Sequence, residues 1–106
     1  MDGGINHLNY YGQIAGKPVP MIARLDGKNS SQNRYTICGS LCTVSDILAK
    51  DVLLSNTTVG DKLMFFNAGA YSVTEARGLF LSRDLPTIVI TSSQGTRLAR
   101  KALPTY

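Results

Sequence analysis

The stretch YTICGSLCTVSDILAKD, residues 35–51, holds both cysteines of the chain, Cys38 and Cys42. Residues 34–39 alternate in polarity and carry β-branched or aromatic side chains, which predicts a β-strand. Gly39 follows this strand, and the Ser, Thr and Asp residues after it are typical of a loop. We therefore expect Cys38 to be a buried strand residue and Cys42 to be a loop residue, whose thiol is more available for reaction.

The spacing of the two cysteines argues against a metal site and against a disulfide. The lone histidine, His7, leaves too few ligands for a closed zinc site. A disulfide across so short a separation would be strained, and cytosolic thiols are kept reduced. From the residues alone, a structural loop and a reactive thiol both remain open for Cys42, and Asp46 is most simply a turn residue.

Apolar runs outside this stretch predict further strands over residues 17–25, 62–71 and 85–93, the last being the clearest buried strand. Short helices are expected within residues 72–80, ending at Gly78, and within residues 96–106, ending at Pro104. Four or five strands, short turns and one or two short helices predict a mainly β fold, a small antiparallel barrel or sandwich.

Length and composition predict a single folded domain over residues 1–106. Hydrophobic residues make up 43% of the chain and charged residues 17%, which is typical of a globular protein. The net charge of +4 comes from scattered Lys and Arg residues, so a small basic β-barrel that binds nucleic acid is only an alternative. Neither a membrane-spanning run nor a signal peptide is recognised, so we expect a cytoplasmic protein without a membrane or nucleic-acid partner.

Four motifs occur in a characteristic order: DGGINH at 2–7, CGSLCTVSDILAKD at 38–51, VGDKLMFFNAGAYS at 59–72 and FLSRDLPTIVI at 80–90. Together they resemble the C-terminal β domain of the fold-type III pyridoxal-phosphate (PLP) decarboxylases, which include diaminopimelate, ornithine and arginine decarboxylases. The resemblance extends over nearly the whole chain. It implies a Greek-key β domain of a larger enzyme, whose N-terminal barrel carries the Schiff-base lysine and is absent here.

The resemblance also implies an activity. The full-length protein is expected to be a PLP-dependent carboxy-lyase that releases CO2 from an amino acid, whereas this domain alone is expected to be inactive and to bind no cofactor. It further implies that two subunits pair head to tail, so that each active site lies between one barrel and the β domain of the other subunit. A catalytically inactive regulatory homologue with the same fold is an alternative.

Four residues of the chain match positions of the family's active site. Cys42 matches the cysteine that reaches into the partner's site and returns a proton to the substrate carbon. Tyr71 matches the tyrosine that binds the cofactor phosphate in its own subunit, while the residues alone also allow a tyrosine packed at a strand end. Asp46 matches the aspartate that we expect to hold the cysteine loop, and Thr43 takes the substrate-binding position after the cysteine.

Two positions depart from the pattern of the diaminopimelate enzymes. Thr43 stands where Glu or Asp usually follows the cysteine, and Tyr10 stands where an Arg is common. The acid meets the cationic far end of the substrate, and a neutral Thr gives up this charge-assisted contact. The full-length enzyme is expected to be diaminopimelate decarboxylase-like, and these two departures give a second hypothesis for its substrate, a less charged or carrier-tethered acyl amino acid.

Overall fold

The protein was analysed as a computed structural model, which describes residues 1–10, 21–25, 31–69 and 71–106. Within these residues the chain is mainly β, as predicted. Its elements are β1 (Ile22–Arg24), β2 (Gln32–Cys38), β3 (Ile47–Ser55), β4 (Leu63–Phe65), α1 (Tyr71–Thr74), β5 (Ile88–Ser92) and β6 (Gly95–Arg100). Three antiparallel pairs form, β1 with β4, β2 with β3, and β5 with β6.

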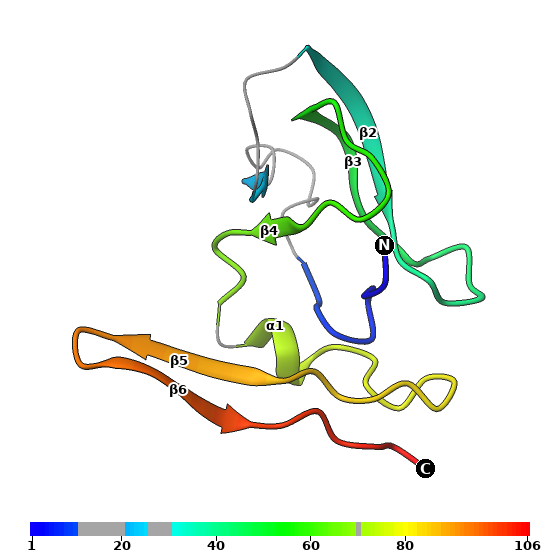
Figure 1. Ribbon diagram of the computed structural model, residues 1–106. Helices are drawn as coiled ribbons and strands as arrows, with labels where there is room; N and C mark the ends of the chain where they lie inside the picture. Colours follow the sequence, from blue (N-terminus) through cyan, green and yellow to red (C-terminus); the bar gives the residue numbers. More distant parts are fainter. Residues whose placement is uncertain (11–20, 26–30, 70) are drawn as a thin grey trace.

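The core lies between the β2–β3 pair and the β1–β4 pair. The upper part of Figure 1 contains β2 and β3, and β4 crosses below them. The buried core residues are Ile37, Leu48, Ala49, Val52 and Leu54, and the partly buried side chains packed against them are Ile5, Tyr10, Ile22, Tyr35, Leu63 and Phe65. Because these side chains come from both pairs and from the N-terminal segment, the core joins segments far apart in sequence.

Strand β3 is the longest strand, and the sequence patterns did not predict it. Its buried positions do not alternate regularly, because its register against β2 shifts twice, between Tyr35 and Ile37 and again between Ile37 and Cys38. Tyr35 pairs with Val52 and Ile37 pairs with Ala49, so β3 is one residue longer over this interval. Asp51 lies in the same interval with a φ of 59°, which is the left-handed region. This β-bulge shifts which side chains face the core and hides the alternation.

The prediction that Cys38 is buried is wrong. Ile37, the preceding residue of β2, is 7% exposed and points into the core. Successive side chains of a strand point to opposite faces, so Cys38 is exposed. Cys42 is also exposed, as expected for a loop residue, and both cysteines are free thiols.

The C-terminal part of the chain also differs from the prediction. The helix expected over residues 96–106 is absent, and residues 95–100 form strand β6 instead. Gly95 has a φ of 121°, which lets the chain reverse tightly after β5. Hydrogen bonding between β5 and β6 then outweighs the weak helical preference of this segment.

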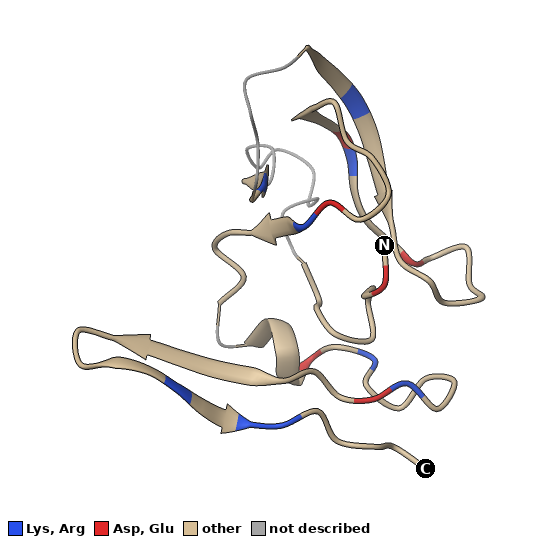
Figure 2. Ribbon diagram, in the orientation of Figure 1, with Lys and Arg blue, Asp and Glu red and all other residues tan. Residues whose placement is uncertain are grey.

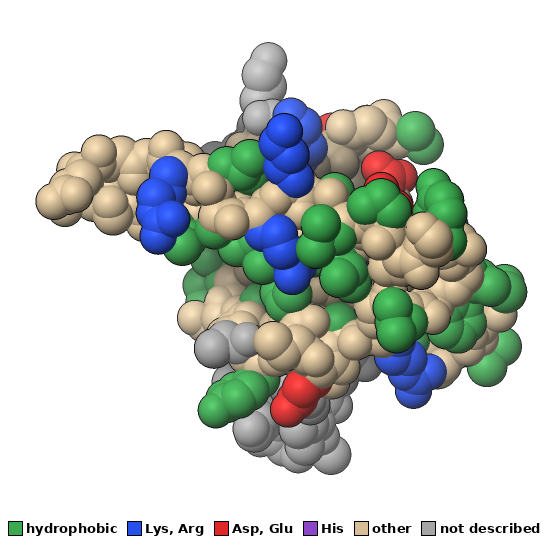
Figure 3. Space-filling view, turned by 90° about the horizontal axis from the view of Figure 1, so that it is seen from below, with side chains coloured by type: hydrophobic (Ala, Val, Ile, Leu, Met, Phe, Trp, Pro, Cys, Tyr) green, Lys and Arg blue, Asp and Glu red, His purple; other side chains and the backbone are tan. Residues whose placement is uncertain are grey.

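Strand β5 is not buried, although its apolar run predicted burial. Val89 is 53% exposed and Ile90 is 41% exposed. The hairpin lies along the lower edge of the molecule (Figure 1), and its face shows apolar and basic side chains side by side (Figure 3). Burial requires a covering surface, and the described residues supply none for this hairpin.

The helix expected over residues 72–80 is reduced to the single turn of α1, Tyr71–Thr74. In the described part of the chain no helix is long and apolar enough to cross a membrane. Residues 17–20 of the first predicted strand lie outside the described residues, and β1 accounts for most of its remainder.

Candidate functional site

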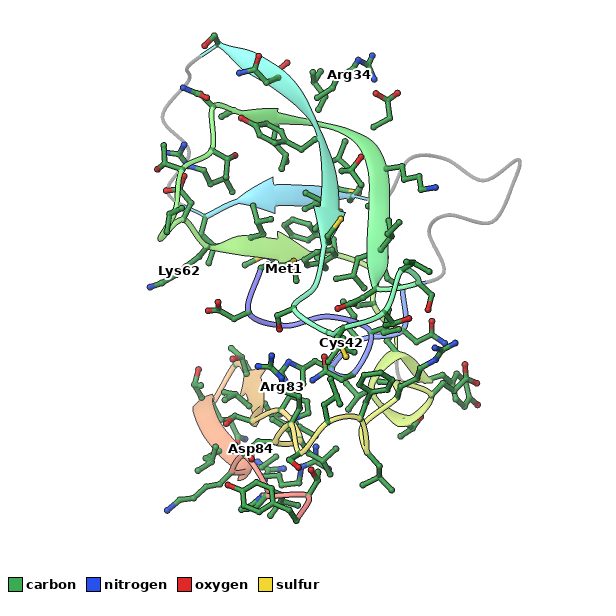
Figure 4. The ribbon with its side chains drawn as sticks, turned by 90° about the vertical axis from the view of Figure 1, so that its right-hand side faces the viewer. Met1, Arg34, Cys42, Lys62, Arg83 and Asp84 are labelled. Carbon is green, nitrogen blue, oxygen red and sulfur yellow. The ribbon has the colours of Figure 1, made fainter. Side chains whose placement is uncertain are left out.

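The loop between β2 and β3, residues 39–46, carries Cys42. A hydrogen bond from the Gly39 amide to the Asp46 carbonyl oxygen, 3.0 Å long, closes the loop at its base. Leu41 is 8% exposed and anchors the loop inward, whereas Cys42 next to it is exposed. Figure 4 shows Cys42 between the β1–β4 strands and the segment that carries Arg83. The loop therefore presents the thiol outward from a fixed base.

Asp46 ties this loop to the N-terminal segment. Its carboxylate Oδ2 accepts the Leu41 amide at 2.8 Å, and its Oδ1 accepts the Ile5 amide at 2.9 Å. The residue is 3% exposed. Hydrogen bonds to an ionised carboxylate are about twice as strong as neutral ones, so this side chain joins two segments firmly.

Two glycines make room for the Asp46 carboxylate. A Cβ atom at Gly4 would lie 2.5 Å from Oδ1 of Asp46, and a Cβ atom at Gly39 would overlap the same carboxylate. Only glycine allows the backbone to approach so closely on both sides. The glycines of the two motifs DGGINH and CGSLC are thus explained by one buried side chain.

Thr43 directs its hydroxyl group back into the loop. Its Oγ1 lies 2.8 Å from the Ser45 hydroxyl oxygen and accepts the Ser45 amide at 3.3 Å. The Asp46 amide donates to the Thr43 carbonyl oxygen at 3.2 Å. Thr43 therefore shapes the loop beside Cys42 and contributes no charge to its surface.

The N-terminal segment, residues 2–9, connects the cysteine loop with α1. The Ile5 carbonyl oxygen accepts the Arg77 amide at 2.8 Å, and the Asn9 amide donates to the Ser72 carbonyl oxygen at 2.7 Å. Since Asp46 holds the amide of the same Ile5, one short segment bridges the two elements that carry Cys42 and Tyr71.

Tyr71 is the first residue of α1, and its side chain is 72% exposed. Its carbonyl oxygen accepts the Glu75 amide at 2.9 Å, which holds the helical turn. The phenol is therefore not packed at a strand end and stays accessible. Cys42, Thr43 and Asp46 share one loop, whereas Tyr71 lies on a separate element.

Tyr10 packs into the core instead of forming part of a charged surface. Its ring meets the ring of Phe65 edge to face, with centroids 5.4 Å apart and an interplanar angle of 83°. Its hydroxyl donates to the Phe66 carbonyl oxygen at 3.3 Å, and burial raises the pKa of the Tyr10 phenol. At this position the chain has a neutral packing residue.

Charged side chains are dispersed over the molecule. Figure 2 shows Lys and Arg on several elements, including β6. Among the residues that the structure describes, no group of three or more His, Cys, Asp or Glu side chains is placed to hold a metal ion.

Comparison with known proteins identifies the family. Residues 1–69 match the family described as "Pyridoxal-dependent decarboxylase, C-terminal sheet domain". The chain belongs to this family. The match includes the cysteine loop and Asp46 but ends before Tyr71.

Two curated proteins similar to the chain are named as decarboxylases. Diaminopimelate decarboxylase of Methanocaldococcus jannaschii is 38% identical over 66 residues, which cover 62% of this chain and 15% of that protein. The L-glutamyl-[BtrI acyl-carrier protein] decarboxylase of Niallia circulans is 29% identical over 107 residues, covering 95% of this chain and 25% of that protein. The chain thus spans a quarter or less of these relatives.

A solved structure supports the fold over the C-terminal part as well. The crystal structure of diaminopimelate decarboxylase from M. jannaschii in complex with L-lysine superposes with a TM-score of 0.79 and 31% sequence identity. The superposition covers 95% of this chain and 22% of that chain. The structural similarity thus extends beyond residue 69, where the family match ends.

The sequence motifs did not reveal which atoms meet around the cysteine loop. Arg83 donates from Nη2 to the Ser40 carbonyl oxygen at 3.2 Å across a separation of 43 residues. His7 Nε2 bonds the Asp84 carbonyl oxygen at 2.9 Å across 77 residues. His7 lies within residues 1–69, which match the family, whereas Arg83 lies beyond them in the stretch FLSRDLPTIVI. Nothing in either stretch indicates these contacts.

Proposed function

We propose that this chain is the C-terminal substrate-facing and dimerisation domain, with a Greek-key topology, of a PLP-dependent amino-acid decarboxylase. The complete enzyme is a cytoplasmic homodimer, and its N-terminal barrel supplies the Schiff-base lysine. The observation that carries this proposal is the exposed, free thiol of Cys42 on a loop whose base is fixed by buried Asp46, in a chain of this family.

Cys42 is proposed to donate the proton that replaces the lost carboxylate. When bound, PLP supplies the electron sink that makes loss of CO2 feasible. The Sγ proton of Cys42 is then transferred to the substrate carbon, which is general acid catalysis by a positioned side chain. Asp46 does not face the substrate, because it is 3% exposed, and its proposed role is to hold the loop.

Tyr71 is proposed to hold the cofactor phosphate through its hydroxyl group. Its 72% exposed side chain fits this role, since a phenol O–H can donate to a phosphate oxygen supplied by another surface. Cys42 and Tyr71 lie on different elements, and we assign them to different active sites. Cys42 serves the site of the partner subunit, and Tyr71 serves the site of its own subunit.

The substrate is proposed to be less charged at its far end than diaminopimelate, or to be tethered to a carrier. Thr43 is neutral and bonded within its loop, and Tyr10 is packed against Phe65. Neither position offers an ionic partner for a distal charge. Similarity over 95% of the chain to a decarboxylase named for a carrier-bound glutamyl substrate supports the tethered alternative.

The test uses the full-length, PLP-loaded decarboxylase that contains this chain. Its turnover is measured with diaminopimelate, ornithine, lysine, arginine and a carrier-bound acyl amino acid. We expect the carrier-bound substrate to give the highest kcat/KM, and efficient turnover of diaminopimelate would contradict the substrate assignment.

The same enzyme tests the role of Cys42. Cys42→Ala is expected to lower kcat by about 10²–10⁴-fold, the usual contribution of a general acid, while the cofactor absorbance stays unchanged. Cys38→Ala removes the other exposed thiol and is the matched control, with kcat unchanged. An unaltered rate and product in Cys42→Ala would sink the assignment.

A further inference from the structure

We propose that Arg83 is a positioning residue for the Cys42 thiol, acting through the peptide unit between Ser40 and Leu41. This inference rests on the proposed function of Cys42 and adds a residue for which the sequence suggested no role. In Figure 4 Arg83 lies on the segment that faces the cysteine loop.

The peptide unit between Ser40 and Leu41 is held at both ends. Arg83 Nη2 donates to its carbonyl oxygen, on Ser40, at 3.2 Å. Asp46 Oδ2 accepts from its amide, on Leu41, at 2.8 Å. A peptide unit is planar, so a cationic donor at one end and an anionic acceptor at the other fix its orientation. Cys42 directly follows Leu41, so the direction of the Cys42 side chain depends on the orientation of this peptide plane.

The backbone of Arg83 and of the next residue, Asp84, is held by contacts from three parts of the chain. Its carbonyl oxygen accepts the Thr105 hydroxyl at 2.8 Å, and its amide donates to the Phe80 carbonyl oxygen at 3.3 Å. The next carbonyl oxygen, of Asp84, bonds His7 Nε2 at 2.9 Å. The base of the Arg83 side chain is therefore fixed relative to the N-terminal segment that Asp46 also holds.

The backbone before Arg83 adopts an unusual shape. Leu81 and Ser82 have φ values of 54° and 51°, so two successive residues other than glycine lie in the left-handed region. Such conformations persist where the surrounding structure requires them. This turn delivers the Arg83 side chain to the cysteine loop.

Arginine suits this contact better than lysine. Ion pairs among the described residues join Arg24 with Asp61 and Arg34 with Asp51, and none includes Arg83. Its guanidinium is instead used to bind a backbone carbonyl, and its rigid planar fork orients the N–H groups. Lysine keeps the charge and a donor but not this geometry, so it should restore the contact only in part.

The experiment compares Arg83→Met and Arg83→Lys with the control Arg97→Met in the full-length, PLP-loaded decarboxylase. Arg97 is exposed on β6. Displacement of a catalytic group by about 1 Å can cost about 10²-fold, so we expect Arg83→Met to lower kcat by about 10–100-fold. The KM and the cofactor absorbance of Arg83→Met should stay within about 2-fold of the unaltered enzyme. The kcat of Arg83→Lys should be intermediate, and the kcat of Arg97→Met should equal that of the unaltered enzyme.

A second measurement does not depend on catalysis. Alkylation of Cys42 by iodoacetamide is followed by mass spectrometry, with Cys38 in the same molecule as the reference. Because a released loop opens more often, Arg83→Met should raise the Cys42 rate by about 3-fold or more and leave the Cys38 rate unchanged. If Arg83→Met does not fold, the kcat and the Cys42 alkylation rate of Arg83→Lys are used to test the inference.

An unchanged kcat together with an unchanged alkylation rate overturns the inference. Loss of cofactor binding in a variant that remains folded also overturns it, because that result indicates a structural effect that reaches beyond the Cys42 thiol. If Cys42→Ala alters catalysis and Arg83→Met does not, only the positioning role fails. If Cys42→Ala has no effect, the proposed function fails, and the alkylation rates still report whether Arg83 holds the loop.

Discussion

At Asp46 one buried carboxylate connects the N-terminal segment with the loop that carries Cys42. Its two oxygens each accept one backbone amide, and glycines at positions 4 and 39 leave the space it occupies. The sequence suggested a turn residue at this position. Its hydrogen bond to the Ile5 amide, 41 residues away along the chain, became visible only in the tertiary structure.

Replacement of Asp46 by Asn should destabilise the protein. Each carboxylate oxygen of Asp46 accepts a hydrogen bond from a backbone N–H group. In the Asn variant an NH2 group takes the place of one of these oxygens and faces a backbone N–H, so two donors meet without an acceptor. We expect the free energy of unfolding to fall by roughly 2–4 kcal/mol, the combined cost of charged hydrogen bonds and an unsatisfied buried donor. Urea unfolding of this chain measures the change.

Asp84→Asn is the matched control, because Asp84 is exposed. Its free energy of unfolding should change by less than about 0.5 kcal/mol, as for other surface substitutions. Equal urea midpoints for the two variants would show that the Asp46 hydrogen bonds do not stabilise the fold.

At the scale of the elements, the turn before β4 contains a second structural carboxylate. Asp61 Oδ2 accepts the Thr58 amide at 2.7 Å and lies 3.4 Å from Arg24 Nη1. The hydrogen bond from the Thr58 backbone, with Arg24 as a further contribution, lowers the pKa of Asp61 below its ordinary value of 3.8. This turn joins β3 to β4 and links it to β1.

The lowered pKa gives a pH dependence with a defined sign. The ionised form of Asp61 is favoured in the folded state, so its stabilisation is complete above the unfolded pKa and is lost as the pH falls through the lower folded pKa. Asp61→Asn should therefore lower the urea midpoint at pH 7 and make little difference at pH 2. A midpoint difference of the same size at both pH values would contradict the prediction.

Strands were predicted correctly where the polarity pattern of neighbouring residues was sufficient. The prediction failed where pairing with another strand determined the structure. Strand β2 follows from alternation over a few residues. The bulge near Asp51 hides the alternation of β3, and pairing with β5 turns residues 95–100 into a strand. Register and pairing are properties of two segments, so neither segment reveals them alone.

At the scale of the whole molecule, the β5–β6 hairpin is not covered by any other described part of the chain. Val89 pairs with Leu98 on one face of the hairpin, and Ile90 pairs with Arg97 on the other. Apolar side chains thus occupy both faces, and Leu98 is 50% exposed. In the proposed dimer, this hairpin is available for contact with the barrel or the second subunit.

Core and hairpin leucines should therefore respond differently to truncation. Leu48→Ala, at a residue 2% exposed, should cost about 2–5 kcal/mol in the unfolding of this chain. Leu98→Ala should cost less than about 0.5 kcal/mol in the same measurement, because little apolar surface is returned to water. Equal losses in urea unfolding would mean that the hairpin is covered in this chain as well.

The sequence by itself determined that the protein is mainly β, that Cys42 lies in a loop after a strand, and that its ordered motifs resemble one family. These features depend on neighbouring residues, whose alternation and turn preferences act over a few positions. Only the tertiary structure decided that Cys38 and β5 are exposed. It also decided that Asp46 and Arg83 both form hydrogen bonds with the peptide unit between Ser40 and Leu41. The exposure of a residue depends on which surfaces pack against it, and the Arg83 hydrogen bond joins groups that are distant along the chain. Neither can therefore be predicted from the pattern of neighbouring residues.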